Sequence, residues 1–342
     1  MKNKDFIESY SYGGFAYSPS LKYKARLQKK EPIAAMVLRE KFDYGLVKLA
    51  IESGADFIDG KTVEDIIISK DKARIILDDK TEINSEIIVG ADGIRSIVAK
   101  KAGLAPKKKK MGVCVFQEYK VDKKTIDKFF GNERMCHIHM GFQNIFGYGW
   151  VFPKKEHINI GIASVSSDYK MNLLNIYKNY FNILKKDGVI PKNLKMGRCK
   201  GGILPVSPLE KTYSEKILLI GDAAGFINPA SGEGIYFAMS SGEIAAKFIC
   251  EALEKGDTSE KNLSKYEKIW KNDFGKDIDM LLGSAKNVGK DVDKFVRLAS
   301  KDKKLADITL SILHGSLSIH EYKLQLICRY IYASLKDLFS IS

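Results

Sequence analysis

Cysteine is scarce in this sequence, and the few cysteines present form no recognisable pattern. Five occur among 342 residues, an odd number, and no two stand in a Cys-x-x-Cys pair. Neither a disulfide framework nor a zinc site is therefore indicated, and a reduced, cytoplasmic setting fits the chain. His137 and His139 would share one face of a strand, but two histidines make an incomplete metal site, and we expect no bound metal.

Long apolar runs are missing as well. No uninterrupted stretch approaches the roughly 18 residues that a membrane span needs, and the N-terminal segment is charged where a signal peptide would be apolar. We therefore expect a protein that does not cross the membrane. Peripheral contact with the inner membrane face stays open.

Acidic residues are outnumbered by basic ones. The chain has 56 Lys and Arg against 42 Asp and Glu, a net charge of +14. Such an excess suits nucleic acid, an anionic membrane surface, or a lysine-rich surface that is merely solvated. No nucleic-acid motif accompanies the charge, so we expect no nucleic-acid partner and keep an anionic lipid surface as the alternative to plain solvation. These numbers do not define an oligomeric state.

The most informative pattern present is a buried strand that runs into an acidic turn. Four apolar residues, 217–220, lead directly to Gly221 and Asp222, as a strand covered on both faces would. Small residues follow, and residues 235–253 are expected to form a helix. Its first turn would present N–H groups and a positive dipole end to the loop, an arrangement that suits anionic parts of a ligand.

A second strand of the same kind lies upstream. Residues 87–89 are apolar, and Asp92 and Gly93 follow with a helix expected at once. Taken alone, Asp92 and Ser96 would also serve as an ordinary turn and helix cap.

The two elements together resemble the FAD motifs of the flavoprotein superfamily that includes aromatic hydroxylases and geranylgeranyl reductases. The resemblance implies FAD, loaded by NAD(P)H or a ferredoxin-like donor. In that superfamily the second Asp meets the ribityl and pyrophosphate region, and the helix start faces the flavin pyrimidine. The resemblance assigns cofactor binding to Arg39, Val63, Asp92, Gly93, Gly221, Asp222, Pro229, Gly232, Glu233, Gly234 and Ile235.

Two of these assignments come from shorter similarities. Arg39 opens an Arg-x-x-Phe-Asp stretch in which the family's arginine approaches the cofactor, although an arginine on such a helix is also a common surface residue. Val63 would lie where the family's backbone meets adenine.

An aromatic stretch resembles the substrate-pocket signature of geranylgeranyl reductases. Tyr148, Trp150 and Phe152 alternate along a strand and precede Pro153, so the three rings would share one face. A wall of this kind suits a long apolar chain, although an ordinary aromatic core strand is the alternative. The family pattern ends in Gly-x-Gly, whereas this chain has Gly161-Ile-Ala.

Gly14 lies in a stretch that resembles the family's glycine-containing loop near the reactive face of the flavin. Archaeal members carry a Cys-Gly pair there, but this chain has Tyr12-Gly13. No catalytic cysteine is therefore transferred, and the catalytic residues stay unassigned.

One expected unit is absent from the sequence. The family begins with a strand, Gly-x-Gly-x-x-Gly and a helix, which bind the ADP half of FAD, and no such unit occurs here. Truncation, supply of the unit by another chain, and loss of FAD with retention of a binding role are three explanations. We favour truncation, which would compromise this chain alone.

The resemblance implies an α/β fold with an incomplete FAD-binding parallel sheet, an inserted antiparallel substrate sheet and a helical C-terminal region. We expect FAD-binding portions at residues 1–105 and 206–256, the substrate sheet at 106–205 and the helical region at 257–342.

The resemblance implies an enzyme, an FAD-dependent reductase of isoprenoid double bonds in prenyl lipids or prenyl quinones. Hydride would pass to an alkene carbon, and a proton would follow. The alternatives are a flavin-dependent monooxygenase or halogenase of the same superfamily, and a non-catalytic protein that binds lipid surfaces through basic C-terminal helices such as 322–338.

Overall fold

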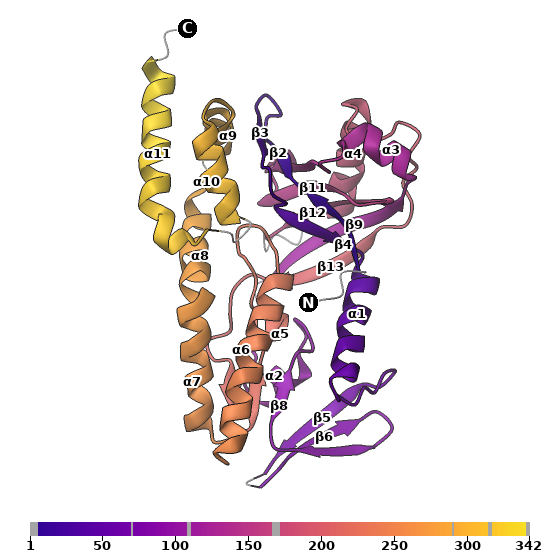
Figure 1. Cartoon of the computed structure of the whole chain (residues 1–342), viewed down its shortest axis with the longest axis vertical. Coiled ribbons are helices and arrows are strands. Elements are labelled where there is room, and N and C mark those ends of the chain that lie inside the picture. The colour runs from indigo at the N-terminus through magenta and orange to yellow at the C-terminus, as the bar shows by residue number, and fades with distance from the viewer. Residues whose placement is uncertain are drawn as a thin grey trace. The chain divides into compact units, whose positions relative to one another are not determined.

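The computed structural model describes residues 6–69, 71–107, 111–165, 172–288, 291–313 and 317–339 (Figure 1). The chain divides into two compact units, each assembled from separate stretches. The first unit contains Met1–Phe57, Gly112–Gly202 and Asn287–Ser342, and the second contains Ile58–Met111 and Ile203–Lys286.

The first unit is built on a seven-stranded sheet with the strand order β13-β9-β12-β11-β10-β2-β3. The strands are β2 (Gly13–Tyr17), β3 (Lys24–Gln28), β9 (Met111–Lys120), β10 (Cys136–Met140), β11 (Gly147–Pro153), β12 (His157–Ser164) and β13 (Lys200–Pro205). The pairing of β10 with β2 is parallel, whereas β9, β12, β11 and β10 form an antiparallel series.

Alternation along β12 explains how this sheet obtains a core. Ile158, Ile160 and Ile162 are all fully buried, as expected where every second side chain points to the same face. That core cluster includes Tyr177 and Tyr180 of helix α4 (Leu173–Lys186). The side chains that alternate with these isoleucines along β12 therefore point to the other face of the sheet.

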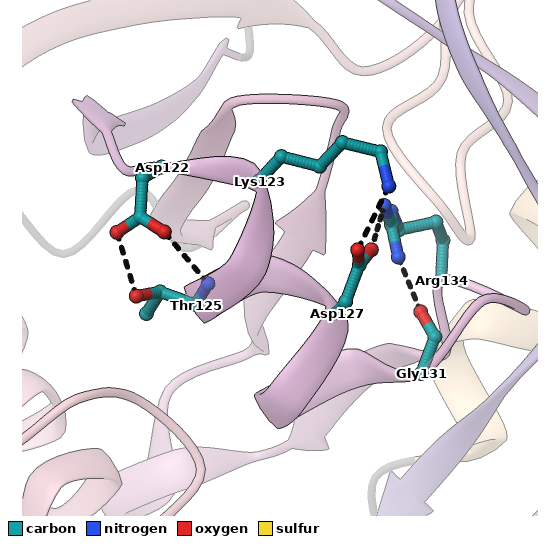
Figure 2. Close-up of polar contacts among 6 residues, drawn as sticks. All are labelled: Asp122, Lys123, Thr125, Asp127, Gly131 and Arg134. Atoms are coloured by element: carbon teal, nitrogen blue, oxygen red, sulfur yellow. Dashed lines mark hydrogen bonds and ion pairs between the residues drawn. The ribbon is translucent and has the colours of Figure 1, made fainter.

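A short polar network fixes helix α3 (Lys123–Phe130) beside the start of β10 (Figure 2). Asp122 caps the helix, because its carboxylate accepts hydrogen bonds from the Thr125 N–H at 2.9 Å and from the Thr125 hydroxyl at 2.7 Å. Asp127 pairs with Lys123 at 2.8 Å and with Arg134 at 2.5 Å. Arg134 also donates to the carbonyl of Gly131, so one buried guanidinium ties the end of the helix to the next strand.

The remaining elements of the first unit are a two-stranded sheet and several helices. They are β1 (Ile7–Ser11), paired antiparallel with β4 (Ala34–Val37), and α1 (Arg39–Glu52), η1 (Phe142–Asn144), α9 (Val292–Lys301), α10 (Lys303–Leu313) and α11 (Ile319–Phe339). Within the described residues, we find no helix both long enough and apolar enough to span a bilayer.

The second unit has two three-stranded sheets and a helical layer. Its elements are β5 (Val63–Ile68), β6 (Ala73–Leu77), β7 (Glu82–Ser85), β8 (Ile88–Gly90), β14 (Tyr213–Ser214), β15 (Ile217–Leu219), α2 (Ile97–Lys101), α5 (Gly221–Ala224), α6 (Ile235–Glu254), α7 (Glu260–Trp270), η2 (Lys271–Gly275) and α8 (Lys276–Val288). The sheet orders are β5-β6-β7 and β14-β15-β8, with β8 and β15 parallel. Every residue of β15 is buried, which confirms the prediction of a strand covered on both faces.

The fold confirms the predicted mixed α/β class with a helical C-terminal region. Two local predictions are wrong. Residues 11–32 are rich in Gly, Tyr, Ser and Lys, which indicates irregular structure, but they contain β2 and β3. The apolar spacing of residues 34–53 predicts a helix from Ala34, but the helix begins only at Arg39. β2 forms because it pairs with β10, which is distant in sequence, whereas β3 pairs with β2 and β4 pairs with β1. The finer division into four sequence portions stays a prediction.

Candidate functional site

Two acidic turns lie at the same edge of one sheet in the second unit. Because β8 and β15 are parallel neighbours, their carboxyl ends meet, and the N–H of Ile220 donates to the carbonyl of Gly90 at 3.0 Å. Asp92 follows β8 and Asp222 follows β15. Ligands of open α/β sheets bind outside the carboxyl ends of the strands, so the two predicted acids occupy a suitable edge.

The turn after β15 is closed tightly onto helix α6. Gly221 has φ +53°, and a Cβ there would lie 3.1 Å from the Cβ of Ala238. The N–H of Gly221 donates to the hydroxyl of the buried Ser241 at 3.1 Å. A carboxylate oxygen of Asp222 lies 3.2 Å from the position of a Cβ on Gly234. The structure therefore brings Asp222 against the residue that precedes α6.

The loop between this turn and α6 is organised by one asparagine. The Asn228 side-chain oxygen accepts from the N–H groups of Ala230 at 2.9 Å and Ser231 at 3.1 Å. The Asn228 N–H donates to the carbonyl of Glu233 at 2.8 Å, and the Gly232 N–H donates back to the carbonyl of Asn228 at 2.8 Å. The predicted residues Pro229 and Gly232 thus belong to a closed loop.

Glu233 caps the start of α6, a role that was not predicted from the sequence. Its carboxylate accepts from the N–H of Tyr236 at 2.7 Å. Partial desolvation of the carboxyl raises its pKa, and the hydrogen bond from Tyr236 acts in the opposite direction. One of the N–H groups expected to face a ligand is therefore satisfied by the protein itself. A carboxylate just before a helix is the sequence signal for such a cap.

Asp92 caps helix α2. Its carboxylate accepts from the N–H groups of Ile97 at 2.7 Å and Val98 at 3.2 Å, and the Ser96 hydroxyl accepts from Ala99 at 2.8 Å. The structure therefore confirms that Asp92 and Ser96 form a turn and cap the helix. A cofactor role for Asp92 stays a prediction.

Gly93 and Val63 differ in their surroundings. Gly93 has φ +74° and open space where a Cβ would stand, which suits close approach of a ligand to the backbone. Val63 begins β5, opposite Leu77, and is half-buried against the hydrophobic core of the unit.

Arg39 belongs to the first unit, whereas the other predicted cofactor residues all belong to the second. Its guanidinium binds the carboxylate of Asp43 at 2.9 Å on the exposed side of α1. The ion pair matches the surface interpretation of this residue, and its approach to a cofactor stays a prediction.

The aromatic residues of β11 share one face of the seven-stranded sheet. The rings of Tyr148 and Trp150 have centroids 5.8 Å apart, and those of Trp150 and Phe152 are 6.1 Å apart and nearly parallel. Trp150 lies opposite Gly161 of β12, where a Cβ would lie 2.1 Å from the indole. The indole therefore rests directly on a glycine. We call Tyr148, Trp150 and Phe152 the aromatic wall; the buried Pro153 ends the strand.

The aromatic wall is supported by a polar network that was not predicted from the sequence. The indole N–H of Trp150 donates to the Asn159 amide oxygen at 2.6 Å, and the Asn159 amide donates to the Glu118 carboxylate at 3.0 Å. The Lys154 ammonium binds the same carboxylate oxygen at 2.7 Å. The network depends on the register of three strands, and the only local signal was polar residues at alternating positions.

Gly14 lies in a strand rather than in the loop expected from the family. In β2 it stands opposite Cys136, and a Cβ there would lie 2.7 Å from the Cys136 carbonyl oxygen. Because Cys136 and Ile138 point to one face of β10, and Ile138 pairs with Trp150, Gly14 faces the same side of the sheet as the aromatic wall. A substrate contact at Gly14 stays a prediction.

The two histidines of β10 lie on the opposite face. The hydroxyl of Tyr17 is 2.8 Å from Nδ1 of His137, and the hydroxyl of Tyr180 is 2.9 Å from Nδ1 of His139. Burial, with the charge of Lys24 nearby, lowers the pKa of both imidazoles to about 3. Both are therefore neutral near pH 7 and paired with tyrosines. No cluster of ligating side chains suitable for a metal occurs in the described part of the chain.

The comparisons with known proteins agree with this geometry. Residues 26–301 match the family model for the lycopene cyclase protein. Digeranylgeranylglycerophospholipid reductase of Methanocaldococcus jannaschii is 34% identical over 278 residues, covering 78% of this chain and 68% of that protein. The protein of the same name from Methanococcus aeolicus is 31% identical over 277 residues, covering 79% and 68%. The chain belongs to the geranylgeranyl reductase family of FAD-dependent oxidoreductases.

Solved structures support the same family. A geranylgeranyl bacteriochlorophyll reductase-like protein from Thermoplasma acidophilum superposes with a TM-score of 0.76 at 25% identity, covering 88% of this chain and 78% of that one. A flavin-dependent brominase superposes with a TM-score of 0.67 at 19% identity, covering 89% and 76%, and shares the fold alone. The halogenase alternative is therefore the more distant likeness.

Proposed function

We propose that this chain reduces isoprenoid double bonds of a prenyl lipid, in the class of digeranylgeranylglycerophospholipid. The observation that carries the proposal is the aromatic wall, which offers three adjoining rings on one sheet face in a chain whose relatives are named for such a lipid. Aromatic rings give a large, stiff apolar surface along which an extended polyene chain can lie. Prenyl quinones present the same chain chemistry.

The residues of the second unit suit the flavin, ribityl and pyrophosphate parts of FAD. Gly93 leaves its backbone open, Gly234 permits close packing beside Asp222, and α6 begins with its positive dipole end at this edge. The small-residue loop closed by Asn228 keeps bulk away from the same place. Reduced FAD, when bound, would supply a hydride to one alkene carbon, and a proton from solvent or a side chain would complete the addition of two hydrogens.

The first unit would provide the substrate surface. Tyr148, Trp150 and Phe152 would bind the polyene and exclude water from it, and Gly14 would leave space on the same face of the sheet. Reduction would require electrons from NAD(P)H or a ferredoxin-like protein.

A membrane surface is the natural source of such a lipid. Helix α11 exposes Leu324, Leu335 and Leu338, each half exposed or more, with Lys323 and Lys336 also exposed on it. Apolar residues flanked by lysine suit peripheral contact with an anionic lipid surface.

Flavin binding is the first experiment. The purified chain is incubated with excess FAD and desalted, and its absorbance spectrum is recorded. Stoichiometric flavin would mean that the motifs of the second unit suffice without the missing Gly-x-Gly-x-x-Gly unit, and it would refute the expected compromise of this chain. A flavin-free chain would contradict the proposal.

Activity is then tested with digeranylgeranylglycerophospholipid in mixed micelles, with dithionite as reductant so that no donor protein is needed. Mass spectrometry should detect the addition of two hydrogens per reduced double bond. A flavin-loaded chain that instead consumes oxygen and hydroxylates its substrate would favour a monooxygenase. For Trp150→Ala we expect weak turnover with flavin retained, whereas loss of flavin would contradict the role of Trp150 in the substrate surface.

A further inference from the structure

The Trp150 indole is held by a chain of polar contacts that the substrate surface alone does not require. We propose that Asn159 and Glu118 are positioning residues, which hold this indole in one orientation and thereby set the shape of the aromatic wall. The contacts run from Lys154 to Glu118, from Glu118 to Asn159, and from Asn159 to Trp150, at 2.7, 3.0 and 2.6 Å. The consequence for substrate selection rests on the proposed function, but the positioning itself does not.

The direction of every contact is determined by chemistry. Lysine only donates, an ionised carboxylate only accepts, and an indole N–H only donates. Asn159 must therefore turn its amide N–H toward Glu118, which leaves its oxygen for Trp150. The amide cannot flip without breaking both of its contacts.

Strand pairing and the burial of Lys154 hold the network in place. Asn159 pairs with Phe152 across one side of β12 and with Glu118 across the other. Lys154 follows β11 directly and is only 7% exposed, so the ammonium of the ion pair is largely shielded from water, whereas the Glu118 side chain is 29% exposed. Breaking such a pair leaves a buried charge uncompensated, which strongly opposes movement of Glu118.

Packing alone would not hold the ring. The residue beneath the indole is Gly161, which has no side chain to block rotation, and the neighbours along the strand are the rings of Tyr148 and Phe152. The bond to Asn159 is the directional contact that selects one rotamer. A preorganised surface binds an extended chain without first losing side-chain freedom, and a misoriented indole would narrow the space along the wall.

The two tryptophans of the chain make the proposal measurable. Trp150 and Trp270 are the only ones, and the indole N–H of Trp270 donates to the Thr212 hydroxyl at 3.0 Å in the second unit. In the ¹⁵N-labelled full chain each indole N–H gives its own NMR signal, which Trp270→Phe assigns. Trp270 then serves as an internal reference for every variant.

Asn159→Leu is the decisive variant. The Trp150 indole signal should move upfield and its hydrogen exchange should accelerate, because the acceptor is gone, while the Trp270 signal stays unchanged. Asn175→Leu, an exposed substitution on α4, is the matched control and should change neither signal. An unchanged Trp150 signal in Asn159→Leu would overturn the proposal.

Glu118 is tested together with its cation, because Glu118→Leu alone would strand a buried lysine. In Glu118→Leu/Lys154→Met the amide of Asn159 is free to flip, and Trp150 exchange should lie between wild type and Asn159→Leu. If the Trp150 indole N–H exchanged as slowly as in wild type, Glu118 would not be a positioning residue.

The kinetic measurement separates positioning from substrate function. With the prenyl lipid, Asn159→Leu should lower kcat/KM by about tenfold through KM, the effect of one lost hydrogen bond, with flavin retained. Trp150→Phe/Asn159→Leu should be no worse than Trp150→Phe alone, because Phe has no N–H to position. Altered indole exchange in a chain with no reductase activity would contradict the proposed function and leave the positioning intact; additive losses would overturn the positioning.

Discussion

A carboxylate oxygen of Asp222 lies 3.2 Å from the point where a side chain on Gly234 would begin. Gly234 itself has φ −122°, a backbone conformation open to any residue. The glycine is therefore required for space rather than for its dihedral angles. This contact joins the acidic turn after β15 to the start of α6, the two parts of the predicted flavin motif.

We predict that Gly234→Ala weakens FAD binding with little effect on folding. The new methyl group would push the Asp222 carboxylate away from the start of α6, but no backbone strain would arise. FAD affinity is measured by quenching of flavin fluorescence on titration. Gly242→Ala in α6 is the control, because its Cβ would meet only ordinary contact at 3.8 Å and should leave affinity unchanged. Equal affinities for the two variants would remove Gly234 from the cofactor site.

The glycine beneath Trp150 leads to a second prediction. In Gly161→Ala the Cβ would stand 2.1 Å from the indole, so the ring must move. We expect destabilisation of about 1–3 kcal/mol, typical of overpacking, and loss of reductase activity with flavin retained. Combining it with Trp150→Phe should recover part of the stability, since the smaller ring leaves room.

The control for this prediction lies in the same sheet. A Cβ on Gly201 of β13 would meet its nearest neighbour only at 3.8 Å, so Gly201→Ala should be close to wild type. Urea unfolding and turnover are measured on both variants. A Gly161→Ala chain as stable and active as Gly201→Ala would show that the indole is not confined as described.

The parts of this fold that could be predicted are those that depend only on nearby residues in the sequence. The apolar run that becomes β15, the glycine and acid after it, and helix α6 depend on periodicity and turn chemistry within a short segment. The strands β2 and β3 escaped prediction, because β2 forms by parallel pairing with β10, more than a hundred residues away in sequence.

In the site, too, only the features that depend on nearby residues in the sequence could be predicted. The three rings of the aromatic wall could be placed on one face from alternation alone. The partners Asn159 and Glu118 could not, because their contact requires the register of β9 against β12, which no local pattern encodes. Glu233 had a visible signal as a helix cap, but its place in a cofactor motif favoured the ligand interpretation.

The buried Arg134 gives a stability prediction that is independent of the cofactor (Figure 2). Asp127→Ala removes its carboxylate partner and leaves Arg134, which is 6% exposed, without a counter-charge. We expect a marked loss in the free energy of unfolding, because the buried guanidinium would keep its charge without a counter-charge. Asp122→Ala on the same helix is the control and should cost less, because it removes only an exposed N-cap. Similar losses for both in urea unfolding would contradict the buried role of Arg134.

Because the two histidines of β10 are buried, we predict that the first unit loses stability in mild acid. Burial lowers the pKa of His137 and His139 to about 3 in the folded chain, against about 6.5 in an unfolded one. Between these values the unfolded chain binds more protons, so acid favours unfolding. The stabilisation is fully present above about pH 6.5 and is lost as the pH falls toward 3, with a slope of up to about 1.4 kcal/mol per pH unit for each histidine.

Replacement of one histidine isolates this effect. Urea unfolding is measured between about pH 7 and pH 5, above the range in which ordinary aspartates titrate. His139→Gln can still receive the Tyr180 hydroxyl bond but takes up no proton, so its free energy of unfolding should fall less steeply with acid than that of wild type. Asn175→Gln, an exposed substitution on α4, is the control and should keep the wild-type slope, because neither side chain titrates. Parallel curves for His139→Gln and wild type would mean that the imidazole of His139 is not kept neutral by its burial between Tyr17 and Tyr180.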